Sequence, residues 1–402
     1  MFRLKTHIGE KYSPLYFLSA LGAGGLAVSF FMYLMFMTPH KAYPMATWNS
    51  LAEIFSGNDL VLQVFSVVAI LGIVIFSIMH IHLLIWNIRE YREYKKTDAF
   101  TNLFNSNAEV QLMALPLTFA MSVNVGFILG ALFIPNLWTV VEYLFPLAQV
   151  AFGIIGVYAI LIFTRYFSRI LITGGFDCTR NNNLSQMLAI FAFSMVGVGF
   201  SASAAMSHNT TTSGIGLVLS ILFISTAIIL ALMKFVLGFR AMFEHGIDRE
   251  SSVSLWIMIP IITLIGISIF RLSMAMHHNF GAHLDPISSL VVFASLVSVQ
   301  LLFGLLGYMV MKQLNYFKDY VKGSESSAAS YALICPGVAS YVLGFFLIHQ
   351  GFVASGLLVP FSPIYVLLII PLIYLQYKTI STLFTLNDKM LFERTTKTDV
   401  IA

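Results

Sequence analysis

The sequence predicts an all-α polytopic membrane protein with ten transmembrane helices arranged as five hairpins. Hydrophobic residues make up 58% of the 402-residue chain and charged residues only 10%, whereas soluble domains carry about 25% charged residues. The apolar residues fall into ten segments, each near the length of about 20 residues that crosses a bilayer core. We expect one domain, 1–402, with a short cytoplasmic N-terminus, 1–13, and a C-terminal tail, 387–402.

The distribution of Lys and Arg predicts the topology. When each is assigned to the nearer end of its apolar segment or to the adjoining loop, their numbers run 3, 1, 4, 0, 3, 0, 3, 1, 3, 0 and 4 from the N-terminus. The first number in this series and every second number after it together account for 20 of the 22 Lys and Arg residues. Loops rich in Lys and Arg stay on the cytoplasmic side, so we expect both termini there, in a plasma membrane or bacterial inner membrane. The exceptions are Lys41, in an outer loop, and Arg271, inside an apolar segment.

The apolar segments set the expected element bounds. The spans are 14–37, 60–87, 110–134, 139–164, 185–207, 213–239, 254–277, 287–312, 328–357 and 362–386. The first follows a basic N-terminus but has no convincing cleavage site, so we expect it to remain as a helix. Cys178 and Cys335 fall on membrane or cytoplasmic segments, where a structural disulfide is not expected. The net charge of +4 follows from the topology and does not indicate nucleic acid.

The odd-numbered segments differ from the even-numbered ones in residue size. The first contains LGAGGLAVS, whereas the tenth contains IYVLLIIPLIYL. Small residues allow close helix contact and also suit a narrow lumen, and proline is tolerated where protein or water satisfies the freed carbonyl. Each small residue alone is also explained by packing; together they predict an inner ring of odd helices around a central pore and an outer ring of even helices. The pore-lining candidates are Gly22, Pro116, Ser122, Gly126, Gly197, Ser201, Pro260, Thr263, Ser340 and Gly344.

Charged residues are nearly absent from the deep parts of the segments. No Asp or Glu lies there, which argues against carriers that bind protons or cations through a buried carboxylate. Arg271 is the one clear intramembrane charge, and it either attracts anions or extends to the outer headgroups.

The chain has ten histidines. His277 and His349 are expected at similar outer depths, where they either lie at the interface or tune protonation of a pore. A haem between them would require facing imidazoles. No nucleotide-binding loop, metal-ligand spacing or nucleophile constellation is present, so we expect neither an enzyme nor a cofactor.

Four stretches resemble one family of membrane proteins. They are YFLSALGAGGLAVSF, EVQLMALPLTFAM, LWIMIPIITLIG and YALICPGVASY, in the first, third, seventh and ninth segments. With the ten-helix pattern, they resemble the family of plant slow anion channels, bacterial tellurite-resistance proteins and fungal dicarboxylate transporters. The resemblance implies a pore kinked at prolines, one per subunit of a homotrimer, that passes nitrate, chloride, sulfite or organic acids.

The position of the gate departs from the family pattern. Members often place a phenylalanine plug just before the proline of the ninth helix, but here Cys335 precedes Pro336. The pore is then wider at this level or closes elsewhere, and Phe270, Phe345 and Phe346 are the remaining gate candidates.

These observations predict a channel or channel-like permease for small inorganic or organic anions, with the lipid bilayer as its surroundings. A secondary carrier or exporter of an oxyanion or dicarboxylate has the same sequence texture and stays open. A membrane redox subunit that binds haem or quinone is the alternative from another class.

Overall fold

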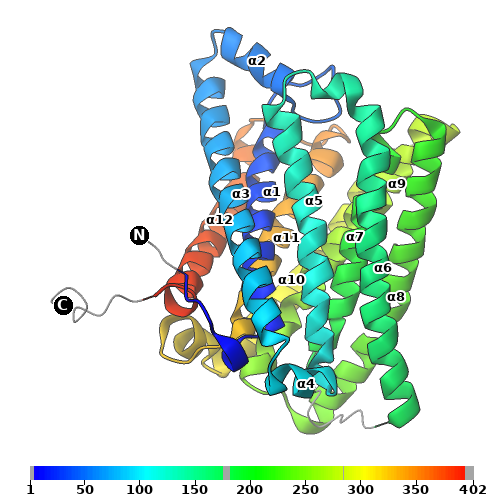
Figure 1. Ribbon diagram of the computed structural model, residues 1–402. Helices are drawn as coiled ribbons and strands as arrows, with labels where there is room; N and C mark the ends of the chain where they lie inside the picture. The colour runs from blue at the N-terminus through cyan, green and yellow to red at the C-terminus, as the bar shows by residue number, and fades with distance from the viewer. Residues whose placement is uncertain (1–3, 175–181, 284, 394–402) are drawn as a thin grey trace.

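The computed structural model describes residues 4–174, 182–283 and 285–393 (Figure 1). Within these residues, ten helical spans are long and apolar enough to cross a membrane, which confirms the predicted number of spans. They are Pro14–Met37, Leu60–Tyr94, Asn107–Phe133, Leu137–Thr173, Ser185–Met206, Thr210–His245, Glu250–Phe280, Pro286–Gln313, Ala328–Val353 and Pro363–Met390. Cys178 and parts of the two predicted terminal segments, 1–3 and 394–402, lie outside the described residues.

The spans are built on ten long α-helices. These are α1 (Phe17–Met37), α3 (Leu60–Tyr94), α5 (Ala114–Phe133), α6 (Val141–Thr173), α7 (Leu188–Met206), α8 (Thr210–His245), α9 (Met258–Phe280), α10 (Pro286–Gln313), α11 (Ile334–Phe346) and α12 (Pro363–Met390). Two short helices, α2 (Trp48–Ser56) and α4 (Asp98–Phe104), lie in connections. The even spans α3, α6 and α8 run past their predicted ends, because a helix satisfies its own backbone and its polar last turns need not stop at the bilayer surface.

Every odd-numbered span begins with a 3-10 helix before its α-helix. The 3-10 segments are η2 (Pro14–Tyr16), η3 (Asn107–Met113), η5 (Ser185–Met187), η6 (Glu250–Ile257) and η8 (Ala328–Leu333). Pro116, Pro260 and Pro336 are each the third residue of the α-helix that follows. Proline lacks an N–H and is tolerated in the first turn of a helix. These prolines therefore mark the change from 3-10 to α geometry within the span.

The odd spans are buried and the even spans are exposed. Between 61% and 94% of the most apolar stretch of each odd span is buried, against 22–33% for the even spans. The odd helices contact one another in a closed order, α1 to α5, α7, α9, α11 and back to α1. The 3-10 segments repeat that order. Each even helix packs against its own odd partner and the next odd helix in the order.

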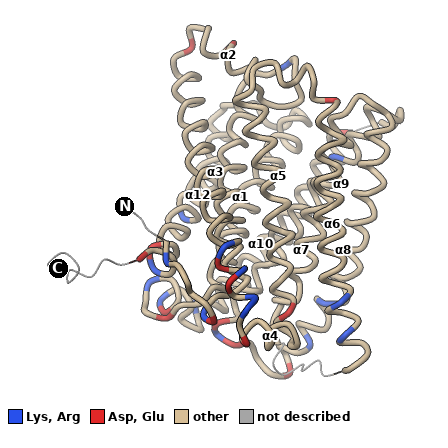
Figure 2. Tube along the Cα trace, viewed as in Figure 1, with Lys and Arg blue, Asp and Glu red and all other residues tan. Residues whose placement is uncertain are grey.

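The two described ends of the chain meet at one end of the bundle. The Lys5 N–H donates to the carbonyl of Leu391 (2.8 Å), and the N–H of Ile8 donates to the Glu90 carboxylate (2.9 Å). Charged residues gather at this end, which we call the charged end, and are sparse at the opposite end (Figure 2). All five odd spans start at the charged end.

We expect Gly72→Ala to destabilise the contact between α1 and α3. A Cβ on Gly72 would lie 2.3 Å from the Phe30 ring, which itself stacks on Phe76. Overpacking of this kind costs about 1–3 kcal/mol. The control is Gly153→Ala, where a Cβ meets nothing within 4 Å and alanine is favoured in a helix by about 0.5–1 kcal/mol. Thermal unfolding in detergent measures both, and equal midpoints would contradict this packing.

Candidate functional site: a cavity among the odd helices

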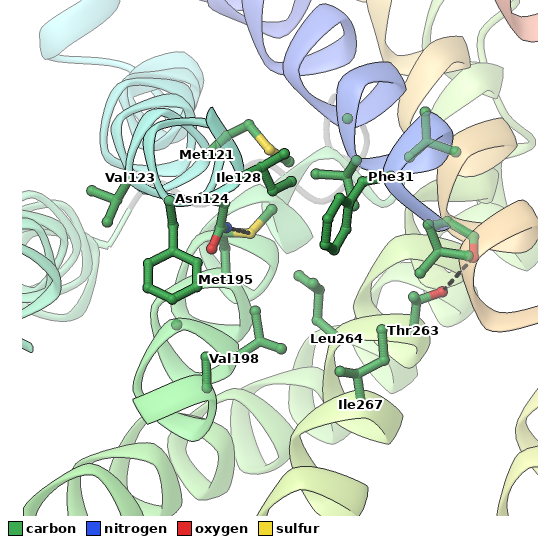
Figure 3. Close-up of a pocket in the computed structure, with 18 of the residues that line it drawn as sticks. Phe31, Met121, Val123, Asn124, Ile128, Met195, Val198, Thr263, Leu264 and Ile267 are labelled. Atoms are coloured by element: carbon green, nitrogen blue, oxygen red, sulfur yellow. Dashed lines mark hydrogen bonds between the residues drawn. The ribbon is translucent and has the colours of Figure 1, made fainter. Parts of the chain in front are cut away.

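A cavity of about 220 Å³ lies among the odd helices. Residues of α1, α5, α7, α9 and α11 line it, and α6 contributes beside α5 and α7. In Figure 3, Phe31, Asn124, Met195 and Leu264 extend from their helices toward this common space. We call it the central cavity.

The wall of the central cavity is mainly apolar, and methionine and phenylalanine are its most frequent residues. Six methionines line it: Met32, Met35, Met45, Met121, Met195 and Met206. Met45 comes from the connection between α1 and α2 and is buried, so this loop contributes to the wall as well. Methionine is flexible and polarisable and adapts to ligands of varied shape.

Two hydroxyl groups in the wall already have hydrogen-bond partners. The Thr263 hydroxyl donates to the carbonyl of Ile259 (3.0 Å) and accepts from the Gln300 amide (2.5 Å). The Ser203 hydroxyl accepts from the Gln149 amide at 2.9 Å. Gln300 and Gln149 lie on the even helices α10 and α6, so hydrogen bonds from the outer helices hold the Thr263 and Ser203 hydroxyls in place.

Two polar side chains in the wall keep hydrogen-bonding capacity. The Asn124 amide donates to the thioether of Met195 at 3.7 Å, a weak acceptor. One guanidinium N–H of Arg271 donates to the carbonyl of Val198 at 3.2 Å. A guanidinium has five N–H donors, so most of the donors of Arg271 have no hydrogen-bond partner among the described residues.

The electrostatic character of the central cavity is positive. Among the residues that the structure describes, Arg271 is the one Lys or Arg that lines it, and no Asp or Glu does. Arg271 is half-buried within the bundle and makes no ion pair with any described residue. The structure therefore places this guanidinium against the cavity.

A smaller cavity of about 80 Å³ lies toward the charged end. Residues of all five 3-10 segments line it, including Leu15, Gln111, Ser185, Ser254 and Ala329. We call it the inner cavity. It is where the odd spans bring their N-terminal ends together.

Three residues line both the central and the inner cavity and therefore lie between them. They are Phe191, Pro260 and Cys335, from α7, α9 and α11. Each is among the first four residues of its α-helix, so the boundary coincides with the change from 3-10 to α geometry. Cys335 is buried and is a free thiol.

The structure places the pore-lining candidates at different depths in the packing. Gly22, Pro260 and Thr263 line the central cavity. A Cβ on Gly197 or Gly344 would meet Ile224 of α8 or Leu372 of α12, so these glycines lie at contacts with even helices. The others, Pro116, Ser122, Gly126, Ser201 and Ser340, are not among the lining residues of either cavity.

The gate candidates are also spread over several environments. Cys335 lines both cavities, Pro336 lines the inner cavity and Phe346 lines the central cavity. Phe270 packs on Phe293 and Phe346, and Phe345 packs on Tyr33 and Tyr341. The sequence reasoning missed Phe191. It is the fourth residue of α7, a helix that has no proline to mark this level, so no signal in the sequence singled it out.

The two outer histidines have separate partners. The His349 ring is buried, stacks on Phe36 and hydrogen-bonds to the hydroxyl of Tyr365 (2.9 Å). The His277 ring is exposed and hydrogen-bonds to the carbonyl of Ala282 (2.8 Å). Neither lines the central or the inner cavity.

No protein-family model matches this chain, and no curated protein matches it either.

We expect Phe191→Ala to open the boundary between the two cavities. Loss of the ring leaves space beside Cys335, so an anionic methanethiosulfonate reagent should label Cys335 several-fold faster. The rate is measured in detergent on protein that carries Cys178→Ser. Phe193→Ala is the matched control, because Phe193 packs on Phe163 and Phe223 and lines neither cavity. Equal labelling rates in the two variants would show that Phe191 does not separate the cavities.

Proposed function

We propose that this protein is an anion channel or channel-like permease whose path runs through the central cavity. The observation that carries the proposal is the charge of that cavity: Arg271 lines it, and none of its described lining residues is acidic. A lone cation in a low-dielectric site favours an anion nearby. Small inorganic or organic anions are the ligand class that this charge fits.

The contacts between helices support a path at the centre of the bundle. The closed order of odd helices is what an inner ring around a pore requires, with the even helices as an outer ring. Four sequence stretches that resemble the slow anion channel family lie in spans of the inner ring. The resemblance and the cavity therefore favour the same transport class.

The inner cavity adds a second source of positive potential. Five spans begin around it, and each helix N-terminus carries roughly half a positive charge. The Lys and Arg bias of the loops assigns the charged end to the cytoplasm. Anions that approach from the cytoplasm would then meet the converging N-termini first and Arg271 afterwards.

Phe191, Pro260 and Cys335 are the narrowest part of the path in this proposal. All three side chains are apolar or weakly polar, and a hydrophobic constriction can close by expelling water. Phe191 on α7 would take the part that the family assigns to an aromatic residue on the ninth span. The resting state is then closed between the two cavities.

A secondary carrier is the second candidate, and the size of the central cavity favours it. Fast conduction requires weak binding, whereas a ligand-sized cavity beyond a constriction suits a carrier of an oxyanion or organic acid. Counterflow separates the two: trans substrate accelerates uptake by a carrier and not by a channel.

We expect potential-driven anion flux from the purified protein in liposomes. Chloride, nitrate, sulfite and malate are compared under an imposed potassium diffusion potential, with protein-free liposomes as the control. Flux that rises with potential and does not saturate supports the channel. Flux that occurs only with counter-substrate moves the assignment to the carrier, and no movement of any anion in either assay would contradict the proposal.

We expect Cys335→Phe to reduce this flux. The added ring narrows the boundary beside Phe191, and a barrier raised by about 1.4 kcal/mol lowers the rate about tenfold. Cys335→Ala is the control, because it removes the thiol without adding bulk. Unchanged flux in Cys335→Phe would place the path away from Cys335.

A further inference from the structure

We infer that the central cavity binds a monovalent anion with an apolar body, such as an aromatic or branched monocarboxylate, through Arg271 and Asn124. The inference rests on the proposed function and narrows its ligand class. Three properties of the cavity carry it: the number of charges, the size and chemistry of the wall, and the placement of the two polar side chains.

The number of charges favours a monovalent ligand. Arg271 is the one cationic side chain among the described residues that line the cavity. A second negative charge on the ligand would have no partner, and an unpaired charge in an apolar site is costly. This argues against dicarboxylates and doubly charged oxyanions as the preferred ligand.

The size and chemistry of the wall favour an apolar body. A cavity of about 150 Å³ lined by apolar side chains holds benzene, and this one has about 220 Å³. That leaves room for a ring or branched chain together with one carboxylate. Six methionine side chains offer thioethers in place of water, so a small hydrated ion such as chloride would lose hydration without recovering it.

The two polar side chains approach α7 one turn apart. The Asn124 amide contacts Met195 and the Arg271 guanidinium contacts Val198. Arg271 contacts the backbone carbonyl of Val198, which is three residues after Met195 on α7, and both residues line the central cavity. Asn124 and Arg271 can then donate to one carboxylate from two sides, with the amide exchanging a weak thioether acceptor for a charged oxygen.

The contacts also define the two ends of the ligand. The carboxylate lies at the Asn124 and Arg271 side chains, and the apolar body fills the space toward Phe31 and Leu264, which extend into the cavity (Figure 3). A neutral molecule of the same shape would keep the apolar contacts and lose the charge-assisted hydrogen bonds from Asn124 and Arg271. This difference makes the inference testable without a variant.

Isothermal titration of the purified protein in detergent tests the ligand class with four compounds. Benzoate is the monovalent anion with an apolar body, chloride the small ion, succinate the dianion and benzyl alcohol the neutral analogue. We expect saturable benzoate binding at least about tenfold tighter than that of any other compound, since charge-assisted hydrogen bonds add to apolar contacts. Chloride or succinate binding as tightly as benzoate would overturn the inference.

Variants assign the binding to the cavity. Arg271→Met should weaken benzoate at least about tenfold and leave benzyl alcohol unchanged, because it removes the charge and keeps an apolar side chain. Arg271→Lys should retain part of the affinity. The control is Arg240→Met, on the exposed part of α8, where Arg240 pairs with Glu244. Benzoate affinity that does not change in Arg271→Met would overturn the assignment to this site.

The outcomes separate this inference from the proposed function. Chloride that binds as tightly as benzoate and depends on Arg271 leaves anion transport in place and removes the apolar ligand class. If benzoate, chloride and succinate all fail to bind and no anion flux occurs in liposomes, both the inferred ligand class and the proposed function are contradicted.

Discussion

The half-buried position of Arg271 among the odd helices is the constraint on which the proposed function depends. Arginine stays protonated in proteins, and the transfer of such a charge from water into a protein interior costs several kcal/mol even after relaxation. Its hydrogen bond to the carbonyl of Val198 offsets part of that cost. The remaining donors face a cavity in which no described acidic residue is available. In the proposed function an anion supplies the missing partner, and because this anion is not part of the chain it can leave.

The repeated start of the odd spans joins the fold to this constraint. Five 3-10 segments contact one another in the same closed order as the helices that follow them. This repetition brings five helix N-termini around one small cavity, and three of the five α-helices have proline at the same third position. Helix geometry therefore contributes positive potential around the inner cavity, whose described lining residues include no Lys or Arg.

The number and order of the spans could be predicted from the sequence, whereas the rotation of each helix could not. Bilayer thickness sets the length of each apolar segment, and the Lys and Arg bias of the loops sets its orientation. Both can therefore be recognised from the composition of whole segments. In a membrane, lipid and protein interior are equally apolar, and a helix such as α7, buried all round, has no polar face to reveal its orientation. Gly22 and Gly126 are both small residues on odd helices, so the sequence does not distinguish them. Gly22 lines the central cavity, whereas a Cβ placed on Gly126 would meet nothing within 4 Å. Phe191 was missed because nothing in its own residue type separates a cavity wall from a helix contact.

Accessibility of two neighbouring positions on α9 tests the central path most directly. Ile267 lines the central cavity, and Ile269, two residues on, is exposed on the outside of the bundle. Each is replaced by cysteine in protein without other cysteines, and anion flux in liposomes is followed while an anionic methanethiosulfonate is added from either side. We expect the reagent to block flux through Ile267→Cys and to leave flux through Ile269→Cys unchanged. Block at Ile269→Cys alone, or at neither position, would contradict a path through the central cavity.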